Sequence, residues 1–468
     1  MHTSSQRFLV SPLRGPLQGE LRVPGDKSIG HRAVLLGALG RGVTTLRGLS
    51  GGEDNQRTVA VFEALGVKVQ REGEVLRIGD VARGPGRARL APPVVDLDCG
   101  NSGTSIRLLC GVLAAQGFHC RLTGDPYLSA RPMRRVVDPL RQMGAQLGGA
   151  EGKKPGEVYP PLVINPQLAP GEEGAPPRLQ GLRYKSPIAS AQVKSALLLA
   201  GLYAEGDTEI IEPTRSRDHS ERMLQALGVP LRTFDEPDGA AGCRLETAGF
   251  SRELPPFTLT IPGDLSSAAF LLGAALLSPG SEVRVRGVGL NPSRTGVLDV
   301  LAAMAPGAVQ IEGARTDMGE PVGDLVVRGG AGLAAVAIGG TLAIRALDEL
   351  PLCAALAAAA HGQTVISGAA ELRVKESDRI AATCALLRAF GVACEERPDG
   401  LVVEGRGPGA LRPARVESFG DHRIAMAGAT LALAAGGESV IEDVGNVATS
   451  FPSFASSLQS LGAELRLG

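Results

Sequence analysis

The sequence predicts an α/β fold of two domains, each built from three copies of one supersecondary unit. At 468 residues the chain is too long for one ordinary core, so two domains are the natural expectation. A helix-like apolar run, a β-rich stretch and a second helix-like run recur six times, with a period of roughly 70–85 residues. Six copies divide evenly into two groups of three.

The second helical run of each copy closes on a hydrophobic residue followed by glycine, which is a usual helix stop. These closures are Leu65-Gly66, Met143-Gly144, Leu227-Gly228, Met304 to Gly307, Phe390-Gly391 and Leu461-Gly462. Five first helical runs end in a similar turn, at Gly42, Gly206, Gly280, Gly362 and Gly437. Each unit therefore reads as strand, helix, strand, helix and then one or two strands.

Short polar residues mark the expected helix starts, because their side chains cap free backbone N–H groups. The candidates are Asp26, Asn101, Ser190, Asp264, Asp348 and Asp421. Each such start also carries the positive end of a helix dipole. Several of them converging on one place would bind an anion.

The sequence restarts near residues 254–260, where the two groups of three units should join. Pro24-Gly-Asp-Lys-Ser is echoed by Pro262-Gly-Asp-Leu-Ser, each followed by an apolar helix. We expect residues 22–258 to form the first domain. Residues 259–468 form the second, with the β-like start of the chain (1–21) returning to it. The Gly- and Pro-rich stretch at 148–177 reads as a surface excursion of the third unit.

Composition excludes several classes of protein. A net charge of −1 and the absence of a basic run argue against nucleic-acid binding. The start is polar and shows no secretory signal, and the longest uncharged stretches are interrupted by Gly, Pro and polar residues, unlike membrane spans. The seven cysteines form no CxxC pair and predict reduced thiols, and no His or Cys spacing suggests a metal. We expect a cytoplasmic protein without a metal or membrane partner.

Charged groups in the first half gather at unit starts. Lys27, Ser28 and Arg32 at a helix start suit a phosphate or carboxylate, although an ordinary capped helix with a basic outer face has the same pattern. The small residues around Gly103 allow a ligand close to the backbone, or form a plain turn. Arg131 precedes a proline, which fixes the local backbone. Its side chain is therefore either held rigidly for binding or is an ordinary surface arginine.

The second half combines acids and bases. Asp348-Glu349 precedes an Ala-rich helix, Lys375-Glu376 and Arg379 follow, and Asp421-His422-Arg423 comes later. Lys375 and Arg379 are four residues apart, so we expect them to share a helix face. A solvated ladder of ion pairs would give this pattern, and so would proton transfer on an anionic substrate.

Taken together, these motifs resemble the 5-enolpyruvylshikimate-3-phosphate (EPSP) synthase family across almost the whole chain. They are GDKSIGHR at 25–32, GNSGTSIR at 100–107, ARPM at 130–133, SAQVK at 190–194, RDHSE at 217–221, DE at 348–349, LRVKESDR at 372–379 and DHRIAM at 421–426. The resemblance implies an inside-out α/β (α+β) fold of two domains, each of three βαβαββ units, with the active site in the interdomain cleft. It implies no cofactor and a monomer.

The resemblance also assigns roles, position by position. Around shikimate 3-phosphate it places Lys27, Ser28, Arg32, Ser190, Ala191, Gln192, Arg217, Asp348 and Lys375. Around phosphoenolpyruvate it places Lys27, Gly103, Arg131, Gln192, Arg379 and Arg423. The implied catalytic groups are Asp348 as base for the acceptor hydroxyl and Glu376 for the methylene proton. Lys27 and His422 are implied to take part.

Glyphosate is the inhibitor implied by this family, and the SAQVK and RDHSE forms look like its class II branch, whose members often tolerate it. Three positions depart from the patterns. Ser293 stands where class II has Thr, Gly103 stands where tolerant members often carry Ala, and Thr449 replaces a lysine of many class I members. The sequence therefore leaves tolerance open.

Two rival functions fit the motifs less well. The sister enzyme that acts on UDP-N-acetylglucosamine carries a reactive Cys five residues before the Arg of ARP, where this chain has Pro126, and has Lys-Asn where this chain has Lys27-Ser28. A non-catalytic repeat scaffold would need none of the charged residues in these motifs. A phosphate-release assay separates all three possibilities.

Overall fold

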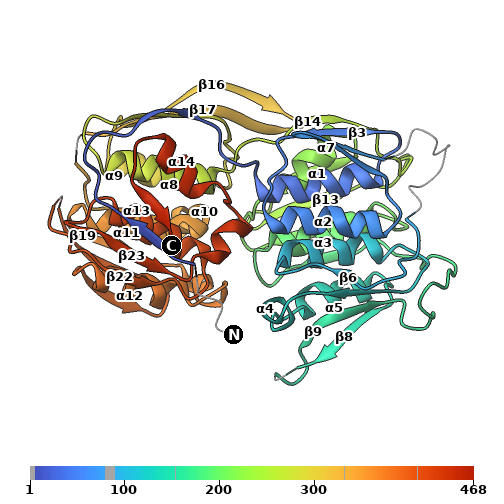
Figure 1. Ribbon diagram of the computed structural model, residues 1–468. Helices are drawn as coiled ribbons and strands as arrows, with labels where there is room; N and C mark the ends of the chain where they lie inside the picture. Colours follow the sequence, from blue (N-terminus) through green and yellow to red (C-terminus); the bar gives the residue numbers. More distant parts are fainter. Residues whose placement is uncertain (1–5, 80–89, 153, 331, 408) are drawn as a thin grey trace. The chain divides into compact units, whose positions relative to one another are not determined.

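The computed structural model describes residues 6–79, 90–152, 154–330, 332–407 and 409–468. It divides into two compact units, which we call the N unit (Lys27–Ile261 and Asp317–Glu320) and the C unit (Met1–Asp26, Pro262–Thr316 and Pro321–Gly468). Figure 1 shows the chain coloured from the N-terminus to the C-terminus.

The helices of the N unit are α1 (Lys27–Leu39), α2 (Glu53–Ala64), α3 (Gly103–Leu113), α4 (Pro126–Ser129), α5 (Arg134–Gln142), α6 (Ala191–Gly201) and α7 (His219–Ala226). Its strands are β3 (Thr44–Arg47), β4 (Val69–Glu72), β5 (Val75–Ile78), β6 (Leu97–Asp98), β7 (Cys120–Thr123), β8 (Leu147–Glu151), β9 (Val158–Ile164), β10 (Arg183–Lys185), β11 (Thr208–Glu212), β12 (Leu231–Asp235), β13 (Ala241–Leu245) and β14 (Thr258–Thr260).

The helices of the C unit are α8 (Leu265–Leu276), α9 (Gly296–Met304), α10 (Gly340–Arg345), α11 (Leu350–Ala358), α12 (Arg379–Ala389), α13 (His422–Ala432) and α14 (Phe454–Ser460). The 3-10 turns are η1 (Leu347–Glu349), η2 (Ala370–Val374) and η3 (Gly445–Thr449). Its strands are β1 (Phe8–Val10), β2 (Gln18–Leu21), β15 (Glu282–Gly289), β16 (Val309–Asp317), β17 (Glu320–Arg328), β18 (Ala337–Ile338), β19 (His361–Ile366), β20 (Ala393–Arg397), β21 (Gly400–Arg406), β22 (Arg415–Glu417), β23 (Ser439–Glu442) and β24 (Leu465–Leu467).

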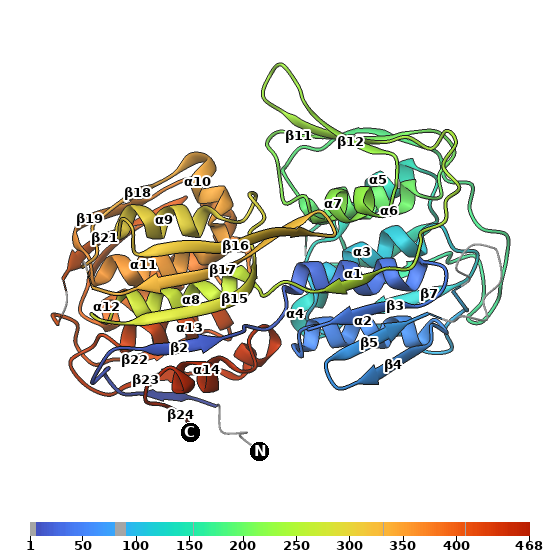
Figure 2. The same cartoon turned by 90° about the horizontal axis from the view of Figure 1, so that it is seen from above.

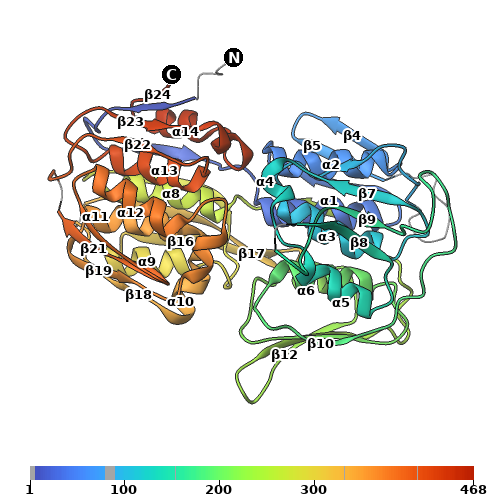
Figure 3. The same ribbon diagram turned by 90° about the horizontal axis from the view of Figure 1, so that it is seen from below.

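The predicted sixfold repeat is confirmed. Among the described residues the strands form six four-stranded sheets, three in each unit. In β10-β11-β13-β12, for example, β10 runs parallel to β11, and β13 runs antiparallel to both β11 and β12. Within each unit the sheets lie outside and the helices fill the interior, as the view from below shows (Figure 3). Apolar helices such as α8, in which every residue is buried, form the core.

Three strands pair far from their sequence neighbours. β1 lies between β23 and β24, and β2 pairs with β15, so the start of the chain completes two sheets of the C unit. β14, which sequence analysis took as the entry into the second domain, instead pairs in parallel with β3 of the N unit. Figure 2 shows β2 beside the C-unit helices. A strand completes whichever sheet offers an unpaired edge, and sequence spacing does not reveal that edge.

The predicted helix closures are also confirmed, because Gly66, Gly144, Gly228, Gly391 and Gly462 all adopt positive φ after the second helix of their units. Only glycine does this without steric cost. Of the predicted helix starts, Ser190, Asp264 and Asp421 are N-caps whose side chains accept backbone hydrogen bonds.

Other local predictions were wrong. Ser102, not Asn101, caps α3, and Asp348 lies inside η1 without capping a helix. The stretch predicted as an excursion at 148–177 contains most of β8 and all of β9, which pair with each other in the sheet that also holds β6 and β7. Glycine and proline weaken strand propensity there, but pairing with β7 supplies the missing stability.

The seven cysteines are free thiols, six of them buried and Cys394 half-buried. Within the described part of the chain, no helix is both long and apolar enough to cross a membrane. No group of three or more His, Cys, Asp or Glu side chains that could hold a metal ion occurs among the same residues.

Candidate active site

The start of α1 presents Lys27 and Ser28 in the N unit. Lys27 Nζ lies 3.0 Å from Asp54 Oδ2, and the Lys27 carbonyl accepts a hydrogen bond from Asn55. The Lys27 side chain is about a quarter exposed, so it is anchored by one carboxylate and still reaches solvent. A lysine at a helix start is suited to an anion.

Arg32, one turn further along α1, is buried, with only 4% of its surface exposed. Its guanidinium donates to Ser220 Oγ at 2.7 Å, to Ser195 Oγ at 2.8 Å and to the Ser28 carbonyl at 2.9 Å. The structure therefore places Arg32 between α1, α6 and α7. Arg32 fixes these helices together and supports the helix start that carries Ser28.

Five predicted or adjacent residues converge at the start of α3. Arg107 donates to Gln192 Oε1 at 2.7 Å and to the Gly103 carbonyl at 3.2 Å. Arg131 donates to the neutral amide oxygen of Asn101 at 2.5 Å. A Cβ added to Gly103 would lie 2.8 Å from Arg107 Nη1 and 3.0 Å from Arg131 Nη1. Two guanidinium groups thus face the space beside this glycine.

Gln192 also donates to Thr104 Oγ1 at 3.0 Å, so α6 and α3 share a hydrogen-bonded contact. Ser190 caps α6, and Ala191 is its first residue. Arg217 lies in the segment between β11 and α7, half-buried. In the N unit, the contacts of Gln192 with Arg107 and Thr104 therefore join the start of α6 to the start of α3.

In the C unit, cations surround Asp348. Its Oδ1 lies 3.4 Å from Arg379 Nη1 and 3.8 Å from Lys375 Nζ, and its Oδ2 lies 3.8 Å from Arg423 Nη2. Arg423 also donates to the Asp348 carbonyl at 3.0 Å. The carboxylate is therefore oriented from three sides.

Arg379 is the centre of this cluster. Only 1% of its side chain is exposed, and it also contacts Glu376 Oε2 at 2.5 Å and Asp421 Oδ2 at 2.8 Å. Although burial opposes it, the pKa of Arg379 is raised, because Glu376, Asp421 and Asp348 stabilise the cation. The pKa of Asp421 is lowered, since the attraction of Arg379 and His422 outweighs burial. The site holds its charges in place by mutual pairing.

One expectation about this cluster was wrong. Lys375 follows η2, which ends at Val374, and α12 begins only at Arg379, so the two cations do not share a helix face. They meet at Asp348 because residues 375–378 form an irregular turn between η2 and α12. Asp378 caps α12 with hydrogen bonds from Ile380 and Ala381, which sets where the helix can begin.

A buried arginine that sequence analysis did not assign supports the same region. Arg294 contacts Asp26 and Asp264 and donates to Ser266 Oγ at 2.7 Å, and Ser266 donates in turn to Glu349. Burial would lower the pKa of Arg294, but the surrounding carboxylates raise it overall. Arg294 directly follows Ser293 in the sequence.

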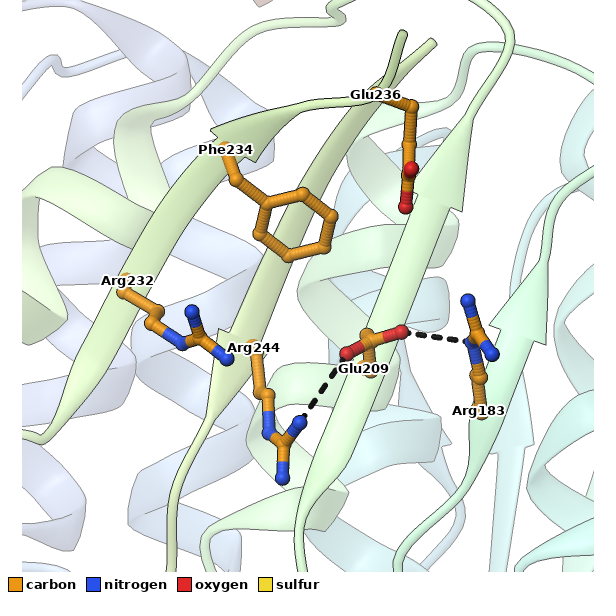
Figure 4. A pocket seen from close by; sticks show the side chains of 6 residues that line it. All are labelled: Arg183, Glu209, Arg232, Phe234, Glu236 and Arg244. Atoms are coloured by element: carbon orange, nitrogen blue, oxygen red, sulfur yellow. Dashed lines mark ion pairs between the residues drawn. The ribbon is translucent and has the colours of Figure 1, made fainter.

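A separate hollow lies on the face of the β10–β13 sheet (Figure 4). It is lined by Arg183, Glu209, Arg232, Phe234, Glu236 and Arg244. Arg183 pairs with Glu209 at 2.8 Å, and Arg244 with the same carboxylate at 3.6 Å (Figure 4). None of the predicted site residues lines it and its three arginines are paired with carboxylates, so the two side-chain clusters above are the better candidates.

Comparison with known proteins shows the family of this chain. The sequence profile of EPSP synthase (3-phosphoshikimate 1-carboxyvinyltransferase) matches residues 13–458. The chain belongs to the EPSP synthase family. It is 51% identical over 445 residues to a 3-phosphoshikimate 1-carboxyvinyltransferase of Geobacter sulfurreducens, covering 95% of this chain and 97% of that protein. It is 48% identical over 462 residues to the enzyme of that name from Acidithiobacillus ferrooxidans, covering 98% and 99%.

Solved structures show the same relationship. The EPSP synthase of Acinetobacter baumannii superposes with a TM-score of 0.86 at 38% identity, covering 99% of this chain and all of that one. The enolpyruvyl transferase NikO of Streptomyces tendae superposes with a TM-score of 0.73 at 19% identity, covering 99% of each chain, which shows the fold alone. The predicted fold class and family are confirmed.

Sequence reasoning assigned no supporting contacts to several residues that hold the EPSP synthase motifs in place. They are Asp54, Asn101, Arg107, Ser195, Glu212, Ser220 and Arg294. The sequence did indicate that some such partners exist, since a lysine or arginine predicted to be buried needs a carboxylate or hydroxyl partner. The partner's position in the sequence is set by the fold and could not be read from spacing.

Proposed function

We propose that this protein transfers the enolpyruvyl group of phosphoenolpyruvate to the 5-hydroxyl of shikimate 3-phosphate, releasing phosphate. The full-length membership in the EPSP synthase family carries this proposal. The two side-chain clusters support it, because one is rich in anion-binding groups and the other combines carboxylates with cations.

The N-unit cluster is proposed to bind the anions. Arg131 donates a hydrogen bond to a neutral amide, which does not offset its positive charge, so that charge can attract phosphoenolpyruvate. Lys27, Gly103 and Gln192 are proposed beside the same substrate. Ser28, Arg32, Ser190, Ala191 and Arg217 are proposed around shikimate 3-phosphate. Holding two anions together against their repulsion brings the reacting atoms close.

The C-unit cluster is proposed to move protons. Asp348 accepts the proton of the 5-hydroxyl as its oxygen bonds to C2 of phosphoenolpyruvate, while Glu376 delivers a proton to the methylene carbon, giving a tetrahedral ketal. Loss of phosphate then breaks the bond between C2 and the phosphate oxygen, Glu376 takes back the proton that leaves the methyl carbon, and the proton on Asp348 passes to the departing phosphate. Arg379, Arg423 and Lys375 orient these groups and contact the anionic substrates, and Lys27 and His422 assist.

A phosphate-release assay tests this function. Release should require both shikimate 3-phosphate and phosphoenolpyruvate, and UDP-N-acetylglucosamine should not replace the acceptor. The position of Pro126 argues against that rival. Where the rival family has its cysteine, this chain has a proline that begins α4, a helix capped by Asp125. Turnover of the nucleotide sugar at a comparable rate would overturn the assignment.

Inhibition by glyphosate, a monomeric state and a cytoplasmic location complete the proposal. Glyphosate should compete with phosphoenolpyruvate in the same assay, because the family's inhibitor occupies that site. Light scattering on the purified protein tests the monomer, and a mass of twice 48.2 kDa would contradict it.

A further inference from the structure

The SAQVK and RDHSE motifs are joined by a buried charged cluster. Lys194 Nζ lies 2.8 Å from Glu212 Oε2 and 2.7 Å from Glu221 Oε1. The three side chains are 4%, 2% and 3% exposed. Glu221 is the last residue of RDHSE and Lys194 the last of SAQVK, whereas Glu212 belongs to neither motif.

Topology explains why the two motifs meet. β10 and β11 are parallel neighbours, so their carboxyl ends lie at the same edge of the sheet. The segment after β10 leads to Ser190 and α6, and the segment after β11 leads to Arg217 and α7. Glu212 is the last residue of β11 and therefore stands between the two segments.

Glu212 holds both segments through hydrogen bonds. It accepts the Ser190 backbone N–H at 2.8 Å, and it accepts the Ser216 hydroxyl at 2.8 Å at both carboxylate oxygens. Ser190 caps α6, while Ser216 directly precedes Arg217. One buried carboxylate thus sets the separation of two segments that carry proposed ligands of the same substrate.

Stability alone does not account for this cluster. A cation in the first turn of a helix opposes the helix dipole, and α6 places Lys194 there. Buried ion pairs are often matched in stability by apolar residues of similar size. Burial lowers the pKa of Lys194, but Glu221 and Glu212 raise it by more, so the lysine stays charged and fixes the Glu212 carboxylate.

We propose that Glu212 is a positioning residue that fixes the Ser190 and Ser216–Arg217 segments at the separation that shikimate 3-phosphate requires, with Lys194 locking its carboxylate. This inference rests on the function proposed above. Glu212 acts through Ser190 and Arg217. It therefore affects binding of shikimate 3-phosphate more than binding of phosphoenolpyruvate.

The two glutamates allow a matched test. Every partner of Glu212 is a donor, so in Glu212→Gln the new amide NH₂ must face a Lys194 or serine donor, and at least one hydrogen bond is lost. In Glu221→Gln the amide oxygen can keep the contact that Oε1 makes with Lys194. The NH₂ replaces Oε2, to which no other described residue offers a hydrogen bond.

The affinity for shikimate 3-phosphate is measured by titration calorimetry, with KM for both substrates and thermal unfolding of each variant. Glu212→Gln should weaken shikimate 3-phosphate binding about tenfold or more, the scale of one lost charged hydrogen bond, and change KM for phosphoenolpyruvate much less. Glu221→Gln should leave the affinity for shikimate 3-phosphate unchanged.

Equal shikimate 3-phosphate affinity in the wild type and Glu212→Gln would overturn the inference, and so would equal losses in the two glutamine variants. If Glu212→Gln fails to fold, Ser216→Ala removes the hydroxyl bonds to Glu212 at a half-buried position and should weaken the same substrate selectively. A wild-type protein that does not bind shikimate 3-phosphate would instead overturn the proposed function itself.

Discussion

Replacing Gly103 by alanine should separate glyphosate from phosphoenolpyruvate. Gly103 begins α3, and its φ lies outside the left-handed region, so alanine causes no backbone strain. The new Cβ would lie 2.8 Å from Arg107 Nη1 and 3.0 Å from Arg131 Nη1. Ordinary contact begins at 3.4 Å, so these atoms must move by about 0.6 and 0.4 Å, respectively.

The cost follows from what holds the two guanidinium groups. Arg107 is buried and bonded to Gln192, and Arg131 is bonded to Asn101, so neither moves freely. Overpacking of this kind costs about 1–3 kcal/mol. We therefore expect KM for phosphoenolpyruvate to rise about tenfold. Glyphosate is the longer molecule, so its inhibition constant should rise by roughly a further tenfold.

Both constants are measured in the phosphate-release assay on one preparation. Asn101→Ala is the control, because it removes the hydrogen bond that holds Arg131 without adding volume. It should weaken the binding of phosphoenolpyruvate and of glyphosate by similar factors. Parallel losses of phosphoenolpyruvate and glyphosate in Gly103→Ala would refute the steric reasoning. Unchanged constants would show that the two arginines lie away from the ligand.

Three further results are expected. Asp348→Asn should lower kcat about a hundredfold or more while thermal unfolding changes little, since Asp348 caps no helix; a kcat near wild type would place the base elsewhere. Arg131→Ala and Arg423→Ala should each raise KM for phosphoenolpyruvate more than KM for shikimate 3-phosphate, at about 1.5–3 kcal/mol for a charged hydrogen bond, whereas equal losses in steady-state kinetics would contradict the assignment. Burial lowers the pKa of His31 to about 3, so the unfolded state binds more protons below its ordinary pKa of 6.5. The free energy of unfolding, measured by chemical denaturation, should therefore fall from pH 6.5 towards pH 4 by up to about 1.4 kcal/mol per pH unit. The decrease should be less steep in His31→Gln.

Much of the fold could be predicted because the repeat is written in local signals. Glycines such as Gly66 and Gly228 end helices through positive φ, and Ser190 and Asp421 cap helices with their own side chains. These devices act within a few residues, so a single sequence reveals them. The failures fell where a neighbouring strand overrode local propensity, as in β9, where Pro160 and Pro161 lie within a paired strand.

The candidate site divides in the same way. The anion-binding character of Lys27 and Arg131 follows from their residue types and their places at segment starts. Their anchoring by Asp54 and Asn101 depends on side chains 27 and 30 residues away in the sequence, respectively. The prediction that Lys375 and Arg379 share a helix failed, because the cap at Asp378 delays α12 and a turn brings them to Asp348 instead.

The sequence by itself determined the sixfold repeat, the helix boundaries set by glycine and capping residues, and the chemical character of each motif. Those properties depend on backbone sterics and side-chain chemistry within one turn or strand. Only the tertiary structure decided which strands β1 and β2 pair with in the second domain, that β14 pairs with β3 of the first, and that Glu212 joins the SAQVK and RDHSE segments. Such pairings depend on which sheet edge or buried donor lacks a partner after folding, and that is a property of the whole assembled core.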